Sequence, residues 1–359
     1  VRGQNNVQGS SDMGAIPFAF PDYQAVADPA NRDKFARVWG VDPETMSLVP
    51  GLTVTEMTRE GSPVKALYIM GENPIISDPD IAHAEAWFRT IEFLVVQDMF
   101  LTETARYGDV ILPAASFAEK TGTFVNTERR IQLSEQAIDP PGQARSDWEI
   151  LVDLSNRIGI KSPFSSPADV MEEIREVAPA WAGVTYARLR GGGLQYPVPH
   201  DDHPGTAFLF ADRFPTADGR ALFHAVEYAD PGELPDDEYP FVMNTGRMLY
   251  HWHTGTMTRR SRGLDAREPV ATVEVHPDDA AELGLADGDM VKITSRRNSI
   301  VISVRMSDRV ARRQIFVPFH FREAAANLLT NPVLEPHAKM AALKVTAVRL
   351  EPATVPATA

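Results

Sequence analysis

The stretch that decides the interpretation of this chain is Thr245-Gly246-Arg247-Met248-Leu249-Tyr250-His251-Trp252-His253-Thr254-Gly255-Thr256-Met257-Thr258-Arg259-Arg260. It follows an apolar run, 239–244, which predicts a buried strand that ends in a glycine-punctuated loop. Arginine forks bind phosphate at two points, threonine hydroxyls add hydrogen bonds, and glycines let the backbone approach a ligand. The stretch therefore predicts a site for a large anionic ligand, with a polar surface hairpin as the alternative.

The composition is that of a globular protein with an acidic surface. The chain has 359 residues, of which 43% are hydrophobic, and this length predicts about two or three domains. Its net charge of −14 argues against general affinity for nucleic acid or anionic membranes. No apolar run in the sequence approaches the ~20 residues of a membrane span.

The chain contains no cysteine, which excludes disulfides, a thiolate nucleophile and cysteine-ligated iron–sulfur clusters within it. It begins with Val1 in a polar, glycine-containing stretch that reads like the middle of a loop. We therefore expect the chain to be the C-terminal piece of a longer polypeptide.

The first half of the chain predicts an α/β arrangement. Apolar runs at 64–70, 93–96 and 110–115 predict parallel strands, and 78–90 predicts a helix between the first two. Ligands of such sheets bind at the carboxyl ends of the strands, here near 71–77 and 97–98. A dinucleotide fingerprint of the G-x-G-x-x-G type is absent, so an ordinary NAD site is not indicated.

Later segments predict further elements. Helices are expected at 147–158, with Ser146 or Asp147 as N-cap, and at 168–177. A hairpin is expected within 207–226, with Asp218-Gly219 as its turn. Short β-rich runs separated by turns then predict a closed β-barrel, and they lie at 241–243, 271–275, 290–294, 300–304 and 315–317.

Three segments of this chain have counterparts that occur in the same order in one known protein family. They are 246–260, the opening Arg2-Gly3-Gln4-Asn5-Asn6-Val7-Gln8-Gly9 with Asp12-Met13-Gly14, and 118–130. Together they resemble molybdenum-dependent formate dehydrogenases, a branch of the oxidoreductases that carry molybdenum or tungsten on two pterin guanine dinucleotides. The resemblance extends from Arg2 to Arg349, which is nearly the whole chain.

The resemblance implies a fold with an α/β, parallel-sheet dinucleotide-binding-like domain and a C-terminal six-stranded β-barrel of the double-psi type. It further implies the following division: an active-site loop at 1–14, the α/β domain at 15–116 and 147–168, segments packing toward a missing N-terminal cluster domain at 117–146 and 169–235, the barrel domain at 236–352 and a tail at 353–359.

The resemblance also implies which residues form the site. Arg2 would pair with the formate carboxylate, and Gln4 would lie beside it on the substrate side. No metal ligand is expected in the chain, because the cysteine or selenocysteine that binds the metal would lie upstream. The residues expected to bind the pterin dinucleotides are Gly71, Asn73, Ser77, Gln97, Asp98, Ala114, Asp147, Arg247, His251, His253, Thr254, Thr256, Met257, Asn327 and Lys344.

The implied function is the oxidation of formate to CO2 by hydride-type transfer to a metal–sulfido centre. The implied cofactor is bis-molybdopterin guanine dinucleotide with molybdenum or tungsten. Iron–sulfur clusters would lie only in the missing N-terminal part or in partner subunits, and electrons would pass through them to flavin and NAD in a cytoplasmic complex. The fragment alone is expected to be inactive.

Other interpretations remain open. Glu119, Asn126, Glu128 and Arg130 would suit a paired-carboxylate site, although the resemblance places this stretch against the cluster domain. His200, Asp201, Asp202 and His203 would suit a metal site in a Pro/Gly loop. The chain as a whole would also suit a non-catalytic nucleotide-binding or assembly module, or another oxoacid reductase such as a nitrate reductase.

Overall fold

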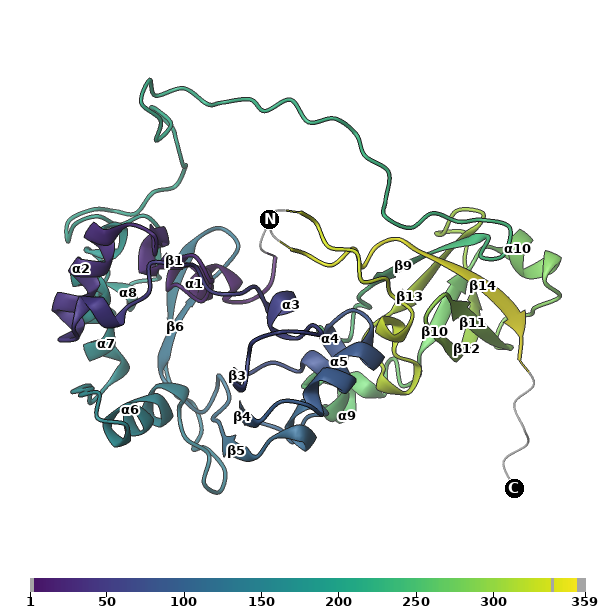
Figure 1. Cartoon of the computed structure of the whole chain (residues 1–359), viewed down its shortest axis with the longest axis horizontal. Coiled ribbons are helices and arrows are strands. Elements are labelled where there is room, and N and C mark those ends of the chain that lie inside the picture. Colours follow the sequence, from purple (N-terminus) through teal and green to yellow (C-terminus); the bar gives the residue numbers. More distant parts are fainter. Residues whose placement is uncertain (1–2, 337–338, 354–359) are drawn as a thin grey trace. The chain divides into compact units, whose positions relative to one another are not determined.

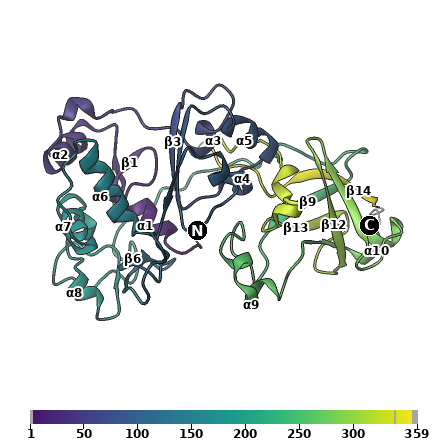
Figure 2. The same ribbon diagram turned by 90° about the horizontal axis from the view of Figure 1, so that it is seen from below.

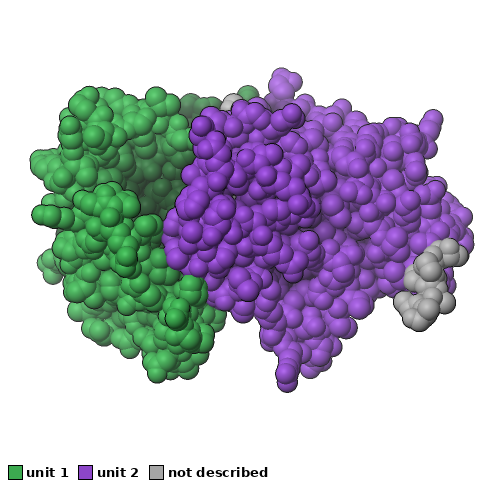
Figure 3. Space-filling model, turned by 60° about the horizontal axis from the view of Figure 1, so that its bottom comes forward, with its two compact units in different colours: residues 1–53, 113–226 green, residues 54–112, 227–359 purple. Residues whose placement is uncertain are grey.

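The computed structural model describes residues 3–336 and 339–353, and the chain forms two compact units (Figures 1 and 3). The first unit comprises residues 1–53 and 113–226, and the second comprises 54–112 and 227–359. The boundaries of these two units differ from those of the predicted domains, and the predicted domain division remains a prediction.

The first unit is built from short helices around a small antiparallel sheet. Its sheet has the order β6-β7-β8, formed by Gly122–Val125, Arg130–Ser134 and Leu194–Gln195. Its core joins Val125 and Ile131 of this sheet to Trp181 and Val198. The remaining elements are α1 (Val7–Asp12), β1 (Ala19–Phe20), η1 (Pro21–Tyr23), β2 (Gln24–Ala25), α2 (Pro29–Trp39), η2 (Pro43–Thr45), α6 (Asp147–Arg157), α7 (Pro167–Val177), η4 (Pro179–Trp181) and α8 (Tyr186–Leu189).

The two helices predicted in this unit are confirmed, and their caps explain where they begin. Ser146 is the N-cap of α6, and the Glu149 carboxylate accepts a hydrogen bond from its backbone N–H at 3.0 Å. Ser166 caps α7 in the same way, with Asp169 as its reciprocal partner. Such capping boxes satisfy backbone N–H groups that a helix start leaves without partners.

The predicted hairpin within 207–226 is wrong. The turn at Asp218-Gly219 forms, with the Phe214 N–H donating to the Gly219 carbonyl at 3.0 Å, but the stretch contains no strand. Its large apolar side chains, among them Phe208 and Phe223, are exposed. A strand needs a face to bury or a partner to pair with, and this segment has neither.

The α/β part of the second unit contains the predicted strand–helix–strand. Strand β3 (Ala66–Met70) pairs in parallel with β4 (Phe93–Asp98), and β5 (Val110–Pro113) extends the sheet in the order β3-β4-β5. The connection carries α4 (Pro74–Ser77) and α5 (Ile81–Phe88), which lie on one face of the sheet (Figure 2). The buried side chains of this layer are Ile69, Ile75, Ile76, Trp87, Phe88, Leu94 and Val96. Helices α3 (Val54–Met57) and η3 (Thr104–Tyr107) complete this part.

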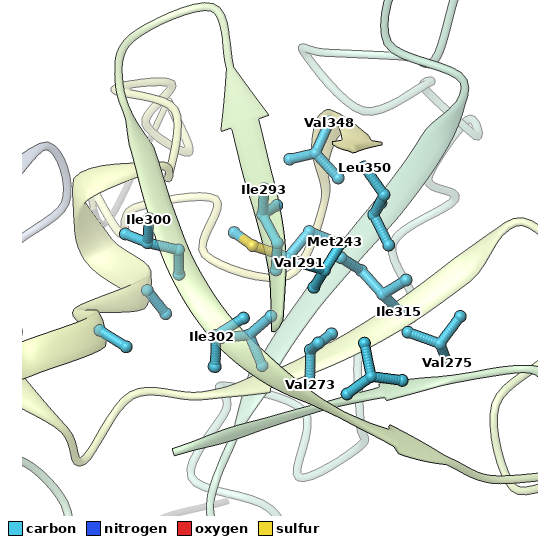
Figure 4. Packing of buried hydrophobic residues seen from close by; sticks show 14 of the residues in the cluster. Met243, Val273, Val275, Val291, Ile293, Ile300, Ile302, Ile315, Val348 and Leu350 are labelled. Carbon is cyan, nitrogen blue, oxygen red and sulfur yellow. The ribbon is translucent and has the colours of Figure 1, made fainter. Parts of the chain in front are cut away.

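The predicted six-stranded barrel is confirmed, closed in the order β10-β12-β11-β14-β9-β13. Figure 4 shows apolar side chains of these strands, among them Met243, Val291 and Ile302, packed against one another. Its strands are β9 (Phe241–Gly246), β10 (Thr272–Val275), β11 (Met290–Ser295), β12 (Ser299–Met306), β13 (Gln314–Pro318) and β14 (Thr346–Pro352). Val291 and Ile293 of β11 point inward while Lys292 between them is exposed, as the pleat of a strand requires. The short helices of this part are η5 (Thr258–Arg260), α9 (Arg262–Asp265), α10 (Pro277–Glu282), η6 (Arg322–Ala324) and η7 (Ala326–Leu328).

Buried polar side chains tie the α/β part to the barrel within the second unit. The Asn327 amide donates to the carbonyls of Ile76 and Ser77, both at 3.0 Å, and so satisfies the end of α4. The Thr330 hydroxyl accepts from the Asp80 N–H at 3.4 Å. The second unit is therefore held together at the loop that follows β3.

The described residues offer neither a membrane-spanning helix nor a cluster of metal ligands. No helix in the described residues is long and apolar enough to cross a membrane. Within the same described ranges, no group of three or more His, Cys, Asp or Glu side chains is arranged to hold a metal ion, and this includes 200–203. There, the His203 Nδ1 atom instead accepts from the Gly205 N–H at 3.1 Å.

Candidate cofactor-binding site

The loop that follows β9 lies at one end of the barrel, together with two other segments. Strands β9 and β13 are parallel and end at Gly246 and Pro318, so the residues after both leave the same barrel end. Strand β14 runs antiparallel to β9 and starts at Thr346, which places Lys344 at this end as well. Residues 247–260, called the ligand loop below, therefore share this end of the barrel with Phe319, His320 and Lys344.

Four basic side chains gather at this end. The Arg247 guanidinium lies over the Trp252 ring at 5.2 Å and near the Phe319 ring at 5.8 Å. Burial, and then the charge of Arg247, lowers the pKa of His253 and that of Lys344. Burial is also the main cause that lowers the pKa of His320, to about 4, and the Arg247 charge acts in the same direction. The Arg247 charge thus adds to burial in lowering the pKa of His253, His320 and Lys344, and such a positive field favours an anionic ligand.

The two other arginines of the ligand loop have structural partners. Arg259 forms ion pairs with Glu323 at 2.7 Å and with Asp265 at 3.3 Å, and it lies over the Phe321 ring. Arg260 donates to the Thr256 carbonyl at 2.6 Å and lies over the Phe100 ring. Both residues therefore shape the loop, and the charge of Arg259 is balanced by its two acidic partners.

His251, predicted to bind the cofactor, is buried and has both ring nitrogens bonded within the protein. The Nε2 atom donates to the Glu268 carbonyl at 2.7 Å, and the Nδ1 atom lies 3.2 Å from the Thr258 hydroxyl. His253, by contrast, is half-buried and adopts a left-handed backbone with φ 46. The geometry therefore gives His251 a role in the shape of the loop.

The predicted threonines connect the ligand loop to the α/β part. The hydroxyls of Thr254 and Thr256 lie 2.9 Å apart, and the Asn73 amide donates to the Thr256 hydroxyl at 3.4 Å. Asn73 is buried; its amide also donates to Glu103 at 2.8 Å, and its carbonyl accepts from the Thr104 hydroxyl at 2.8 Å. Asn73 and Thr256, 183 residues apart in the chain, are thus brought together.

The other residues predicted at the strand ends lie where the α/β pattern places them. Gly71 follows β3 with φ 67, and its N–H donates to the Gln97 carbonyl at 2.9 Å. Gln97 is fully buried near the end of β4 and accepts from the Tyr68 hydroxyl. Asp98 accepts from the Phe100 N–H at 3.0 Å. Ser77 lies at the end of α4, where Asn327 binds its carbonyl.

An acidic pair in the loop after β3 was not found from the sequence. The pKa of Asp78 is raised to about 7, mainly by burial and then by the charge of Glu72, while hydrogen bonds from Thr58 and Ser77 oppose the rise. Burial also raises the pKa of Glu72. Carboxyl groups that hold their protons near neutral pH can donate hydrogen bonds as well as accept them.

The remaining predicted residues belong to the first unit or lie outside the described residues. Arg2 lies outside them. Gln4 precedes α1, and this loop is fastened by the Asn6 side chain, whose oxygen accepts from the Val125 N–H at 3.0 Å. Ala114 bridges to Arg145, and Asp147 forms an ion pair with Lys120. The predicted convergence of Asp147 with the residues of the second unit stays a prediction.

Two cavities accompany these elements. One of about 560 Å³ lies beside the ligand loop and is lined by Arg247, Met248, Leu249 and Tyr250 together with Glu268, Glu274, Arg305, Arg309, Val310 and Phe316. The other, of about 640 Å³, lies at the amino end of β3, lined by 60–65 and part of α5. It contains none of the predicted site residues. Met257, predicted in the site, is exposed on the ligand loop.

Comparisons with known proteins agree with this arrangement. Residues 2–157 match the family model described as molybdopterin oxidoreductase, and residues 241–347 match the one described as molydopterin dinucleotide binding domain. The F420-dependent formate dehydrogenase subunit alpha of Methanocaldococcus jannaschii is 48% identical over 98% of this chain and 52% of its own length. The F420-dependent formate dehydrogenase 1 subunit alpha of Methanococcus maripaludis is 46% identical over the same shares.

A solved structure supports the fold alone. The acetylene hydratase from Pelobacter acetylenicus has a TM-score of 0.68 at 16% identity, covering 91% of this chain and 50% of that one. The chain spans about half the length of the curated relatives it matches. The two matched segments and the relatives of similar sequence lead to one conclusion: the chain carries a molybdopterin oxidoreductase domain and a molydopterin dinucleotide binding domain.

Proposed function

We propose that this chain is the C-terminal part of a formate dehydrogenase catalytic subunit, in which the ligand loop holds a molybdopterin guanine dinucleotide. The observation that carries the proposal is the gathering of Arg247, His253 and Lys344 at the end of the barrel beside Asn73. Relatives named as formate dehydrogenase alpha subunits match the chain along its length, which supports formate as the substrate.

The residues present fit such a cofactor. Arg247 and Lys344 would bind its phosphates, since a guanidinium and an ammonium are the usual phosphate partners. Thr254 and Thr256 would add hydroxyl contacts, and the exposed Trp252 ring offers a flat apolar face for a fused ring. When bound, the cofactor's metal supplies the two-electron acceptor for the substrate.

Formate would be bound by the loop that precedes α1. Arg2 offers two parallel donors that match a carboxylate, and Gln4 offers a neutral amide beside it. Asn6, which has a left-handed backbone with φ 58, fixes this loop to β6 through the bond to Val125. The chain's own residues would therefore orient the C–H bond of formate, which becomes CO2 on losing one proton and two electrons.

Electrons would leave through iron–sulfur clusters in the rest of the subunit or in partner subunits. The sequence interpretation favours flavin and NAD as their destination. A second candidate acceptor is F420, because the two relatives described above are named F420-dependent. Reduction of NAD or of F420 by the intact parent protein with formate decides between them.

The test of the cofactor assignment is Arg247→Gln in the intact parent protein, with Arg267→Gln as its control. Arg267 is an exposed arginine that follows α9 and lies outside the basic cluster. Arg247→Gln should lower the guanine nucleotide that copurifies with the protein, because one charged phosphate contact is worth about 1.5–3 kcal/mol. Arg247→Gln protein with parental nucleotide content would contradict the assignment.

A further inference from the structure

We propose that His320 is a positioning residue which fixes the shape of the ligand loop by bridging two of its backbone groups as a neutral imidazole. The inference rests on the proposed function, since it concerns the loop that would hold the cofactor. His320 follows β13 and is 1% exposed, so it acts from inside the barrel end and does not itself face a ligand.

The bridge has one acceptor and one donor. The Nε2 atom of His320 accepts from the Met248 N–H at 2.8 Å. The Nδ1 atom lies against the His253 carbonyl, which has no hydrogen to give, so Nδ1 must carry the proton. Neutral histidine with its hydrogen on Nδ1 satisfies both contacts, whereas an imidazolium would turn a second N–H toward the Met248 N–H.

The surroundings keep the ring in this form. Burial, together with the charges of Arg247, His251 and His253, lowers the pKa of His320 to about 4, and the bond to the His253 carbonyl opposes them. The rings of Phe319 and Phe321 lie at 5.1 and 6.2 Å and that of His251 at 5.6 Å. At neutral pH the ring is therefore uncharged, and it keeps one donor and one acceptor for the two backbone groups.

The bridged stretch includes backbone conformations that contacts with other residues must stabilise. His253 has φ 46 and Gly255 has φ 74, both in the left-handed region that disfavours ordinary side chains. A Cβ atom on Gly255 would lie 2.7 Å from the His320 carbonyl oxygen, so the loop backbone presses directly on His320. The bond to the His253 carbonyl thus stabilises a left-handed backbone that a non-glycine residue such as His253 adopts only at a cost in free energy.

A second buried histidine, His251, belongs to the loop itself and also holds its backbone. His251 bonds to the Glu268 carbonyl and to the Thr258 hydroxyl, which also accepts from the Trp252 N–H at 3.1 Å. The two inward histidines hold the backbone, while Arg247 and Thr254 carry the proposed ligand contacts. His320 differs from His251 in that it joins the first part of the loop to its left-handed turn.

The test uses the full chain, GDP as the probe and His320→Phe, which keeps the ring packing but removes both bonds. His320→Gln retains one acceptor and one donor, and His276→Phe, at the N-cap of α10, is the control. We expect His320→Phe to speed hydrogen exchange of the Met248 amide and to weaken GDP binding, each by at least about fivefold. His320→Gln should restore part of both, and His276→Phe should change neither.

Nitrogen NMR of the unsubstituted chain provides a readout that does not depend on any variant. The His320 ring should be neutral at pH 7 with its hydrogen on Nδ1. A hydrogen on Nε2, or unchanged Met248 exchange or GDP affinity in His320→Phe, would overturn the proposal. If the unsubstituted chain fails to bind GDP, the proposed function is contradicted. The ring tautomer and the hydrogen exchange of the Met248 amide then still decide whether His320 holds the loop.

Discussion

Replacing Glu233 should strongly destabilise the second unit. Its carboxylate is 9% exposed and lies between two arginines: Arg297 binds it with both terminal nitrogens, at 2.7 and 3.0 Å, and Arg296 lies at 3.1 Å. It also accepts from the Ala347 N–H at 2.9 Å, at the start of the closing strand β14. Arg297 in turn donates to the Leu329 carbonyl at 3.0 Å, close to Asn327. One carboxylate thus connects the segment before the barrel, the β11–β12 turn, β14 and the segment that binds α4.

The size of the effect follows from this environment. Glu233→Gln keeps the shape but removes the charge, and its amide places N–H groups against a guanidinium. Breaking a buried ion pair costs about 3–5 kcal/mol. Arg297 is 17% exposed and Arg296 35%, so some of this cost is recovered by water. We expect a loss of about 2–4 kcal/mol in the free energy of unfolding.

The measurement is urea unfolding followed by circular dichroism, with equal slopes required before free energies are compared. Glu238→Gln serves as the matched control, because Glu238 pairs with Arg349 at 3.0 Å but is 65% exposed. It should cost no more than about 1 kcal/mol. Equal effects of the two variants, or a loss below about 1 kcal/mol for Glu233→Gln, would refute the reasoning.

Two further predictions follow from the structure, and two follow from the resemblance to formate dehydrogenases. Asp78→Asn should stabilise the chain by about 1–3 kcal/mol at pH 8 and should have no effect below pH 4. The reason is that the pKa of Asp78 in the folded chain is raised to about 7, so the unsubstituted chain loses stability as the pH rises through that value. Equal effects of the substitution at both pH values would contradict this prediction. Asn327→Ala should cost about 2–3 kcal/mol in urea unfolding, because two α4 carbonyls lose their donor. The control is Asn298→Ala, at an exposed asparagine in the β11–β12 turn, and a smaller loss for Asn327→Ala than for this control would contradict the prediction. Arg2→Lys in the metal-loaded parent should lower kcat/KM for formate at least about a hundredfold, while the isolated chain should show no turnover.

Much of the fold could be predicted because its strands have simple patterns. The runs at β3, β4 and β9 are apolar and end at glycine or polar residues, and β11 alternates as a strand with one buried face does. Strand β14 was missed, since its first three residues are all buried and show no alternation. The hairpin was expected from a turn that does form, but nothing pairs its flanks.

The site could be predicted only in part, for a related reason. Strand ends mark where a ligand meets an α/β sheet, and Gly71, Asn73 and Gln97 do lie at strand ends, while their contact with a cofactor stays a prediction. The bond from Asn327 to Ile76 joins residues 251 positions apart, and no local pattern indicates such a contact. The same holds for His320, whose bridge to Met248 spans 72 positions.

The most direct test of the cofactor assignment is joint analysis of guanine nucleotide and metal in the intact parent protein. The account predicts guanine nucleotide released on acid hydrolysis together with stoichiometric molybdenum or tungsten, both reduced by Arg247→Gln. A purified parent that oxidises formate yet contains neither guanine nucleotide nor either metal would contradict it.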